Sequence, residues 1–139
     1  MNYKQLMQLT KKNTGFINHV GLKVTDVGEG YAKGELELEP VHGNPIGSVH
    51  GGVLFTLSDT VAGIAATTRG YIVTTMNASI HYINPAIRSS SLFAEAKEVK
   101  SGKRTAVYDV DITDDLGVHI STARFSFFHL KEYEDSFVE

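Results

Sequence analysis

Apolar and polar residues alternate along most of the second half of the chain, with the period of two that is typical of strands buried on one face. The segments that follow this pattern are 72–83, 90–99, 103–113 and 118–130. Two more strands are predicted nearer the N-terminus, at 19–27 and 30–39, where leucine and glutamate alternate over residues 35–39. In the 72–83 segment the alternation places these side chains on one face: Met76, Ala78, Ile80 and Tyr82.

One long helix is predicted from about Gly51 to Thr68, and a short amphipathic helix at 3–12. Between Val53 and Ala66 nearly every position of the long helix is apolar or small, so this helix lacks a wide face for solvent. We therefore expect the sheet to wrap around it. The order of two strands, one long helix and four strands predicts an α+β fold: an antiparallel β-sheet of five to six strands around one long central helix, plus a short N-terminal helix.

Composition narrows the class of function. The 139 residues fit a single domain, 1–139, and the absence of cysteine excludes disulfides and any cysteine-based metal site or nucleophile. A formal charge of −3 without a stripe of Lys and Arg argues against nucleic-acid binding. No two histidines have the spacing of a helical metal site, and no apolar run approaches the ~18 residues that span a membrane. We expect a cytoplasmic protein with no metal, no nucleic-acid partner and no membrane partner.

Asp59 is the one acidic residue inside the long helix. Burial of an unpaired carboxylate is costly, so Asp59 must face a polar cleft or bond to a partner. Its neighbours one turn towards the C-terminus, Ala62 and Gly63, are small and leave room for a ligand. The purely structural alternative is a hydrogen bond to Ser58, to Thr60 or to loop backbone.

Two glycines, Gly51 and Gly52, open the same helix, although glycine is a poor helix former. The first turn of a helix presents unpaired backbone N–H groups and a partial positive charge. Because these residues have no Cβ atom, a ligand carbonyl can approach the N–H groups, which would stabilise an oxyanion. The alternative is that the glycine pair only makes a flexible entry to the helix.

Helix geometry separates Gly51 from Asp59. Eight residues of ideal helix set them about 12 Å apart and rotate them by roughly 80°. If both act on one substrate, the acid must come from a neighbouring subunit. The spacing therefore predicts a dimer with shared active sites.

The stretch from Asn44 to Asp59, NPIGSVHGGVLFTLSD, resembles in register the signature of the hotdog-fold acyl-CoA thioesterases, specifically the phenylacetate-pathway (PaaI-like) group of the 4-hydroxybenzoyl-CoA thioesterase superfamily. The strand order, the single long helix and the GKRTAVYDV strand extend the resemblance over about residues 15–130. The resemblance implies hydrolysis of an acyl-CoA thioester to free acid and CoA, with no cofactor beyond the coenzyme A of the substrate. It also implies a homodimer, or a homotetramer built as a dimer of dimers.

The resemblance implies a role for each matching residue. Gly51 would polarise the thioester carbonyl through its backbone N–H. Asp59 of the opposing subunit would activate the attacking water as general base, or attack directly as nucleophile. Asn44 and His50 would shape and hydrogen-bond the thioester end of the pocket, and Thr75 would help to orient the water.

The substrate-binding residues expected around these groups are Gly47, Gly52, Phe55, Lys103 and Arg104. The two basic residues follow Ser101 and Gly102 and are expected to contact the phosphates of CoA; the alternative is an ordinary charged hairpin. The side chains expected to shape the acyl pocket are Phe55, Met76, Tyr82 and Phe93.

Two other functions remain open. Hotdog hydratases and dehydratases also bind acyl thioesters, but they resemble one another in pairing a His with a carboxylate earlier on the helix, where this chain has Phe55 and Leu57. A non-catalytic acyl-CoA-binding protein is the second alternative. Acyl-CoA sensors that control transcription carry a DNA-binding segment, and no such segment is visible in the sequence.

Overall fold

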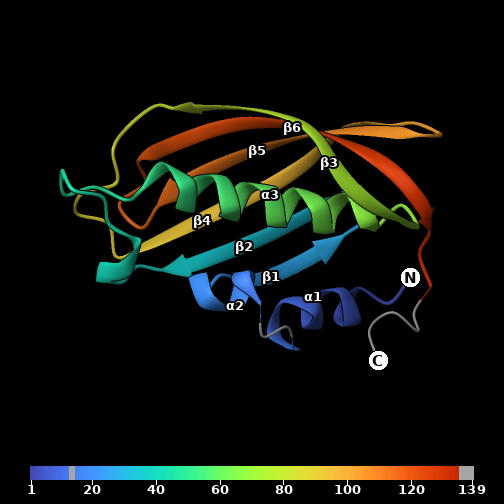
Figure 1. Cartoon of the computed structure of the whole chain (residues 1–139), viewed down its shortest axis with the longest axis horizontal. Helices are drawn as coiled ribbons and strands as arrows, with labels where there is room; N and C mark the ends of the chain where they lie inside the picture. The colour runs from blue at the N-terminus through green and yellow to red at the C-terminus, as the bar shows by residue number, and fades with distance from the viewer. Residues whose placement is uncertain (13–14, 135–139) are drawn as a thin grey trace.

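The computed structural model describes residues 1–12 and 15–134 and shows one sheet folded around one long helix (Figure 1). The strands are β1 (Lys23–Gly28), β2 (Tyr31–Glu37), β3 (Tyr71–Tyr82), β4 (Ser91–Ser101), β5 (Thr105–Asp114) and β6 (His119–Glu132). Neighbouring strands pair antiparallel in the order β1-β2-β4-β5-β6-β3. The helices are α1 (Tyr3–Lys12), α2 (Phe16–Val20) and α3 (Gly51–Thr67), with a 3₁₀ turn at Pro40–His42. The α+β fold expected from the sequence is confirmed, with six strands in the sheet.

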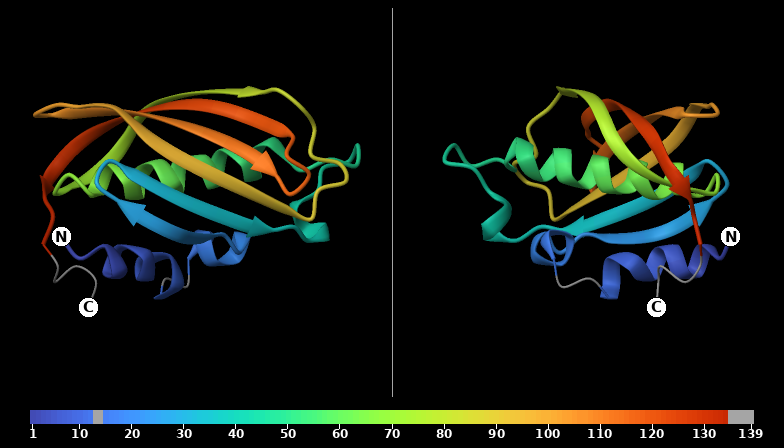
Figure 2. Two further views of the ribbon diagram at one scale, coloured as in Figure 1. Left: turned by 180° about the vertical axis from the view of Figure 1, so that it is seen from behind. Right: turned by 45° about the vertical axis from the view of Figure 1, so that its right-hand side comes forward.

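α3 packs on the inner side of the curved sheet, as the views in Figures 1 and 2 show. Leu57 and Val61 are fully buried there, and burial of each side chain contributes about 1.5–3 kcal/mol. Helix and sheet come closest at Gly34 of β2, where an added Cβ would lie 2.6 Å from Val61 Cγ2. A larger residue at position 34 would therefore push α3 away from the sheet.

The sheet wraps around α3 as expected, and one side of the helix is left uncovered in the single chain. On this uncovered side the residues are half-buried or exposed, and we call them the open stripe: Gly52, Phe55, Thr56, Asp59, Thr60, Gly63 and Ile64. They recur every three or four residues, which places them on one face of the helix. Most of them are small or polar, so their exposure in a single chain costs little. The open stripe carries the acid that the sequence singles out.

The N-terminal segment differs in part from the prediction. α1 forms as expected and buries Leu6 completely. The strand expected at 19–27 begins only at Lys23, because His19 and Val20 end the short helix α2. Gly21 terminates this helix with a φ of 91°, a left-handed conformation that favours glycine.

β3 departs from regular alternation at a bulge. Its register against β6 shifts around Met76, whose side chain is 51% exposed. Met76 therefore does not share a face with Ala78 and Ile80, which pack against the core. Because the extra residue resets the alternation, Thr75 also faces α3, where it bonds to Asp59.

Asp114 holds the β5–β6 hairpin and is almost completely buried. Its carboxylate accepts hydrogen bonds from the Ser89 hydroxyl and from the backbone N–H groups of Leu116 and Val118, at 2.6 to 3.0 Å. Burial raises the pKa of this carboxyl, but the hydrogen bonds outweigh burial and hold the pKa below its ordinary value of 3.8. The ionised group therefore stabilises the fold above pH 3.8, and this contribution is lost as the pH falls through the lowered pKa.

We expect Asp114→Ala to lower the free energy of unfolding at neutral pH by about 2 kcal/mol, because buried donors lose their acceptor. The difference from the wild type should shrink below the ordinary pKa of the carboxyl. Urea unfolding at several pH values measures both effects. The matched control is Asp111→Ala, which removes an exposed carboxylate from the same strand and should change the free energy by less than about 0.5 kcal/mol. Equal losses in the two variants would contradict this role of Asp114.

Candidate active site

Asp59 lies on the open stripe and has one side-chain partner. Thr75 of β3 donates its hydroxyl to Asp59 Oδ1 at 2.7 Å. Within the described part of the chain Oδ2 has no donor, so it is available to bind a water molecule. Both residues line a pocket of about 260 Å³ on the surface of α3, which we call the Asp59 pocket. Its other lining residues are Ile17, Thr60, Gly63, Ile64, Thr67, Val73 and Phe127, so among the described residues Asp59 supplies the only ionisable side chain of this pocket.

The hydrogen bonds of Asp59 test the alternative that this residue is purely structural and bonds to Ser58 or Thr60. Among the described residues, neither Ser58 nor Thr60 bonds to the carboxylate, and Ser58 is fully buried. Of the two adjacent threonines, Thr75 contacts the acid and Thr74 does not. The contact agrees with the residue chosen from the sequence, and the role of Thr75 in orienting water stays a prediction.

His50 caps the first turn of α3. Its Nδ1 accepts the Gly52 N–H at 2.8 Å, and its carbonyl accepts the Val53 N–H at 2.9 Å. Since Nδ1 is an acceptor, neutral His50 carries its proton on Nε2, which can donate to a ligand. No acceptor for the Gly51 N–H is present among residues 1–12 and 15–134. The Gly51 N–H is therefore a donor at the positive end of the helix that a ligand carbonyl can use.

Close contacts, not backbone conformation, account for the two glycines. Neither Gly51 nor Gly52 has a positive φ. An added Cβ at Gly51 would lie 3.1 to 3.3 Å from the aromatic side chain of Tyr82, and one at Gly52 would lie 3.0 to 3.2 Å from the imidazole of His50. Tyr82 also donates its hydroxyl to the Gly51 carbonyl at 3.1 Å. The pair makes room for two rings, which a merely flexible helix entry would not require.

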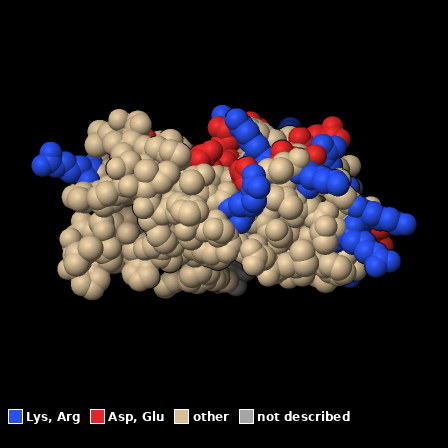
Figure 3. All heavy atoms as spheres, turned by 90° about the horizontal axis from the view of Figure 1, so that it is seen from above, with Lys and Arg blue, Asp and Glu red and all other residues tan. Residues whose placement is uncertain are grey.

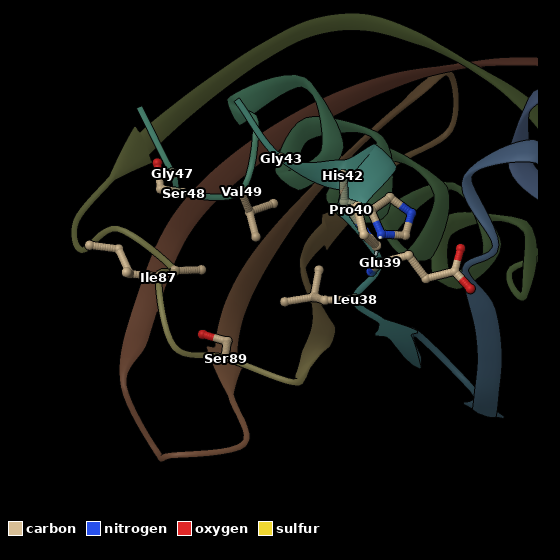
Figure 4. A pocket seen from close by; sticks show the side chains of 11 residues that line it. Leu38, Glu39, Pro40, His42, Gly43, Gly47, Ser48, Val49, Ile87 and Ser89 are labelled. Atoms are coloured by element: carbon tan, nitrogen blue, oxygen red, sulfur yellow. Dashed lines mark hydrogen bonds between the residues drawn. The ribbon is translucent and has the colours of Figure 1, made fainter. Parts of the chain in front are cut away.

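The loop before α3 contains two more of the expected site residues, Asn44 and Gly47. Asn44 bonds within the loop: its Oδ1 accepts the N–H groups of Ile46 and Ser48, and its amide donates to Ser48 Oγ. Gly47 has a φ of 88° at the end of this turn. It lines a pocket of about 330 Å³ between this loop and residues 86–89 (Figure 4). Within one chain, therefore, neither Asn44 nor Gly47 lines the Asp59 pocket.

A second pocket on α3, of about 460 Å³, lies at the first turn. Its lining residues are Phe16, His19, Val20, Val41, His42, His50, Gly52, Val53 and Thr56. Phe55 lines neither pocket on α3; its ring lies 5.4 Å from that of Phe125. Phe93, which was expected to shape the acyl pocket, is exposed on β4 between two buried neighbours and lies on the outer face of the sheet.

The basic pair lies far from the first turn of α3 in the same chain. Lys103 and Arg104 are exposed on the β4–β5 turn, and this turn lies at the opposite end of the molecule from the start of α3 (Figure 1). Their carbonyls accept hydrogen bonds from the side chain and the backbone of His129. Figure 3 shows the charged side chains gathered over one half of the upper face and nearly absent from the other half. Within one chain the pair therefore does not lie beside Gly51.

Gly51 and Asp59 keep the separation that the sequence predicts. α3 is a continuous α-helix from Gly51 to Thr67, so eight residues still span about 12 Å. A single chain therefore does not place the free N–H beside the acid.

Sequence reasoning missed the contribution of α2. Ile17 lines the Asp59 pocket and Phe16 lines the pocket at the first turn. A helix of five residues gives too little periodicity to be detected. The contact between Tyr82 and Gly51 was also missed, because the two residues lie 31 positions apart.

Two negative findings apply to the described residues. No group of three or more His, Asp or Glu side chains in residues 1–12 and 15–134 could hold a metal ion. No helix of the same residues is long and apolar enough to cross a membrane.

Residues 46–119 match the family model of the thioesterase superfamily, and this match includes α3, the candidate acid and Thr75. The chain belongs to the thioesterase superfamily. A putative esterase of Archaeoglobus fulgidus is 30% identical over 87% of this chain and 79% of its own length. Acyl-coenzyme A thioesterase 13 of Mus musculus is 32% identical over 81% and 83%, and acyl-coenzyme A thioesterase PaaI of Escherichia coli is 28% identical over 74% of each chain.

Solved structures agree with the fold of this thioesterase. The PaaI protein of E. coli superposes with a TM-score of 0.87 at 24% identity and covers 94% of each chain. A Streptococcus mutans protein bound to acetyl CoA superposes with a TM-score of 0.79 at 25% identity, over 82% of this chain and 92% of its own. These similarities, together with the sequence relatives, confirm the PaaI-like hotdog resemblance.

We expect Thr75→Val to slow thioester hydrolysis about tenfold, because Asp59 loses the hydroxyl that orients it while the shape of the side chain is kept. Steady-state rates measure the effect, and thermal unfolding checks that the fold is intact. Thr74→Val is the matched control, since Thr74 is exposed and does not contact the acid. Equal rates for the two variants would contradict the assignment.

Proposed function

We propose that this thioesterase hydrolyses acyl-CoA thioesters to the free acid and CoA, in an active site that two subunits share. The hydrogen-bonded pair of Asp59 and Thr75 carries the proposal, because it places a carboxylate in an otherwise uncharged pocket on the open side of α3. The names of the mouse and E. coli relatives and the acetyl CoA in the S. mutans structure support acyl-CoA as the substrate class.

In the proposed reaction the thioester carbonyl accepts a hydrogen bond from the Gly51 N–H of one subunit. Asp59 of the partner subunit takes a proton from water through Oδ2, and the water oxygen bonds to the carbonyl carbon. Negative charge then develops on the carbonyl oxygen at the positive end of α3. The C–S bond breaks, and the CoA thiolate takes the proton from Asp59. Direct attack by Asp59, with later hydrolysis of the anhydride, remains the alternative route.

The free edge of β3 supports a dimer. β3 ends the sheet, has 12 residues and contains no Lys, Arg, Asp or Glu. Edge strands are usually protected against pairing by charges, proline or shortness. An uncharged edge of this length is therefore suited to pair with β3 of a second copy. In the proposed dimer this pairing brings the open stripes of the two α3 helices together.

The same symmetry bears on the CoA phosphates. Helices related by a two-fold axis across an antiparallel strand pair run in opposite directions. The β4–β5 turn of the partner then lies at the end of the dimer where Gly51 of the first subunit lies. We therefore propose that Lys103 and Arg104 of the partner subunit contact the phosphates of CoA, although the pair is remote from Gly51 within one chain.

The acyl group is assigned to the Asp59 pocket. Ile64, Val73 and Phe127 give this pocket apolar walls. Gly63 has no side chain that would fill the pocket. An added Cβ there would meet only Phe127, at 3.9 Å, so it would occupy space that is now empty. The pocket has a volume of about 260 Å³ within one chain, and in the proposed dimer the partner subunit supplies further walls.

The hydratase alternative receives no support from the helix. Phe55 and Leu57 stand where that alternative needs a carboxylate, and Leu57 is fully buried. A panel of acyl-CoA substrates separates the functions, because thiol release indicates a thioesterase and hydration of crotonyl-CoA indicates a hydratase. The absence of both reactions would indicate a non-catalytic binder.

The shared site can be tested by mixing two inactive variants. We expect Asp59→Asn to reduce the rate of thioester hydrolysis by about a thousandfold, and Gly51→Pro to be strongly impaired as well. Half of the dimers in an equal mixture carry one chain of each variant. Each such dimer has one intact site if the site is shared, so about a quarter of the wild-type activity should return.

No activity returns on mixing if each chain uses its own Gly51 and Asp59, and this result would contradict the shared site. Sedimentation of each sample checks that the chains associate, and native mass spectrometry, which resolves the masses of the two variants, checks that they exchange. Sedimentation also distinguishes a homodimer from a homotetramer.

The Gly51 N–H can be tested separately from the space at Gly51. Proline is tolerated at the first position of a helix, where it removes only an unpaired N–H. We expect Gly51→Pro to lower kcat by about a hundredfold relative to Gly51→Ala, because both variants add a Cβ and only the first removes the donor. Equal kcat values would show that the N–H does not stabilise the transition state.

A further inference from the structure

Tyr82 is the last residue of β3 and lies against the first turn of α3. Its hydroxyl donates to the Gly51 carbonyl at 3.1 Å. Its ring occupies the space that a side chain at residue 51 would need, with ring atoms 3.1 and 3.3 Å from the position of an added Cβ. The side chain is nevertheless 53% exposed, so its burial alone does not explain an aromatic residue at this position.

The first turn is held from two sides. His50 precedes the turn and caps it through the Gly52 N–H. Tyr82 reaches the same turn from the sheet, and in the described part of the chain it is the one side chain that hydrogen-bonds to Gly51. As the first residue of α3, Gly51 also takes part in the hydrogen bonding of the helix, and Tyr82 adds a second constraint on it from the sheet. The Gly51 N–H has no acceptor among the described residues, so its direction depends on how firmly the first turn as a whole is held.

We propose that Tyr82 is a positioning residue for thioester hydrolysis: it presses on Gly51 and binds its carbonyl, and so holds the Gly51 N–H in the direction that the reacting carbonyl oxygen needs. This inference rests on the proposed function. A hydrogen-bond donor stabilises the transition state only if it is directed at the developing charge before the reaction. A misplacement of about 1 Å can cost a hundredfold in rate. Tyr82 therefore acts on kcat and not on the affinity for CoA.

The first experiment is a double-mutant cycle on Tyr82 and Gly51, measured with an acyl-CoA that the wild type hydrolyses. We expect Tyr82→Ala to lower kcat about thirtyfold with KM within about twofold, and Tyr82→Phe, which keeps the ring, to stay within about threefold of the wild type. Gly51→Ala displaces the ring and should lose a similar factor. Because both changes break one contact, the double variant should be no slower than Tyr82→Ala alone.

The controls separate positioning from folding. His81→Ala removes the neighbouring exposed side chain of β3 and should keep the kcat of the wild type. Thermal unfolding should be similar for His81→Ala and Tyr82→Ala. The proposal is overturned if the double variant loses the product of the two single factors, or if Tyr82→Ala raises KM and leaves kcat unchanged.

A second measurement needs no substrate. Amide hydrogen exchange at Gly52 and Val53 reports how firmly the first turn is held. We expect exchange at both amides to rise at least fivefold in Tyr82→Ala and to stay unchanged in His81→Ala. Unchanged exchange in Tyr82→Ala would overturn the inference even if the enzyme is active. If the wild type hydrolyses no acyl-CoA, the proposed function fails, and exchange still decides whether Tyr82 holds the turn.

Discussion

The rigidity of α3 is the constraint on which the candidate site depends. An α-helix fixes the distance between the Gly51 N–H, which belongs to the backbone, and the carboxylate of Asp59 two turns further along. No side-chain rotation brings them to one reacting carbon. A catalytic pair built from them requires two helices, and therefore two chains. The open stripe on α3 and the uncharged free edge of β3 are the surfaces that a second copy would cover.

α3 combines a buried side and a reactive side because of the size of its residues. Leucine, valine and alanine fill the side that faces the sheet, and Gly34 of β2 lets the helix lie close to it. Glycines and threonines on the other side leave depressions that become the two pockets along the helix. A helix with large apolar residues all round would be more stable in the core, but it would have no room for a substrate.

Much of the fold followed from periodicity, since the long helix and the strands after it are long enough for the pattern to be unambiguous. The α2 helix was missed because five residues carry little periodicity, and Met76 was assigned to the wrong face because a bulge depends on the register with β6. Asp59 was singled out as the one acid inside an apolar helix, Thr75 came from the family resemblance, and the structure brings them together. The distant locations of Gly47 and of the basic pair were not predictable, because they depend on how loops pack in three dimensions.

Gly51 and Gly52 of the HGG sequence leave space for two things: a ligand at the helix N-terminus, and neighbouring side chains of the protein itself. Read as sequence, Gly51 and Gly52 make room for a ligand at a helix N-terminus. The structure shows that the room is already taken in part by Tyr82 and by the imidazole of His50. A Cβ at residue 51 would therefore disturb the packing of the protein before it met any substrate. Tyr82 ends the strand whose free edge is suited to a second copy, so the strand that we assign to the dimer contact also carries the hydroxyl that bonds to the Gly51 carbonyl.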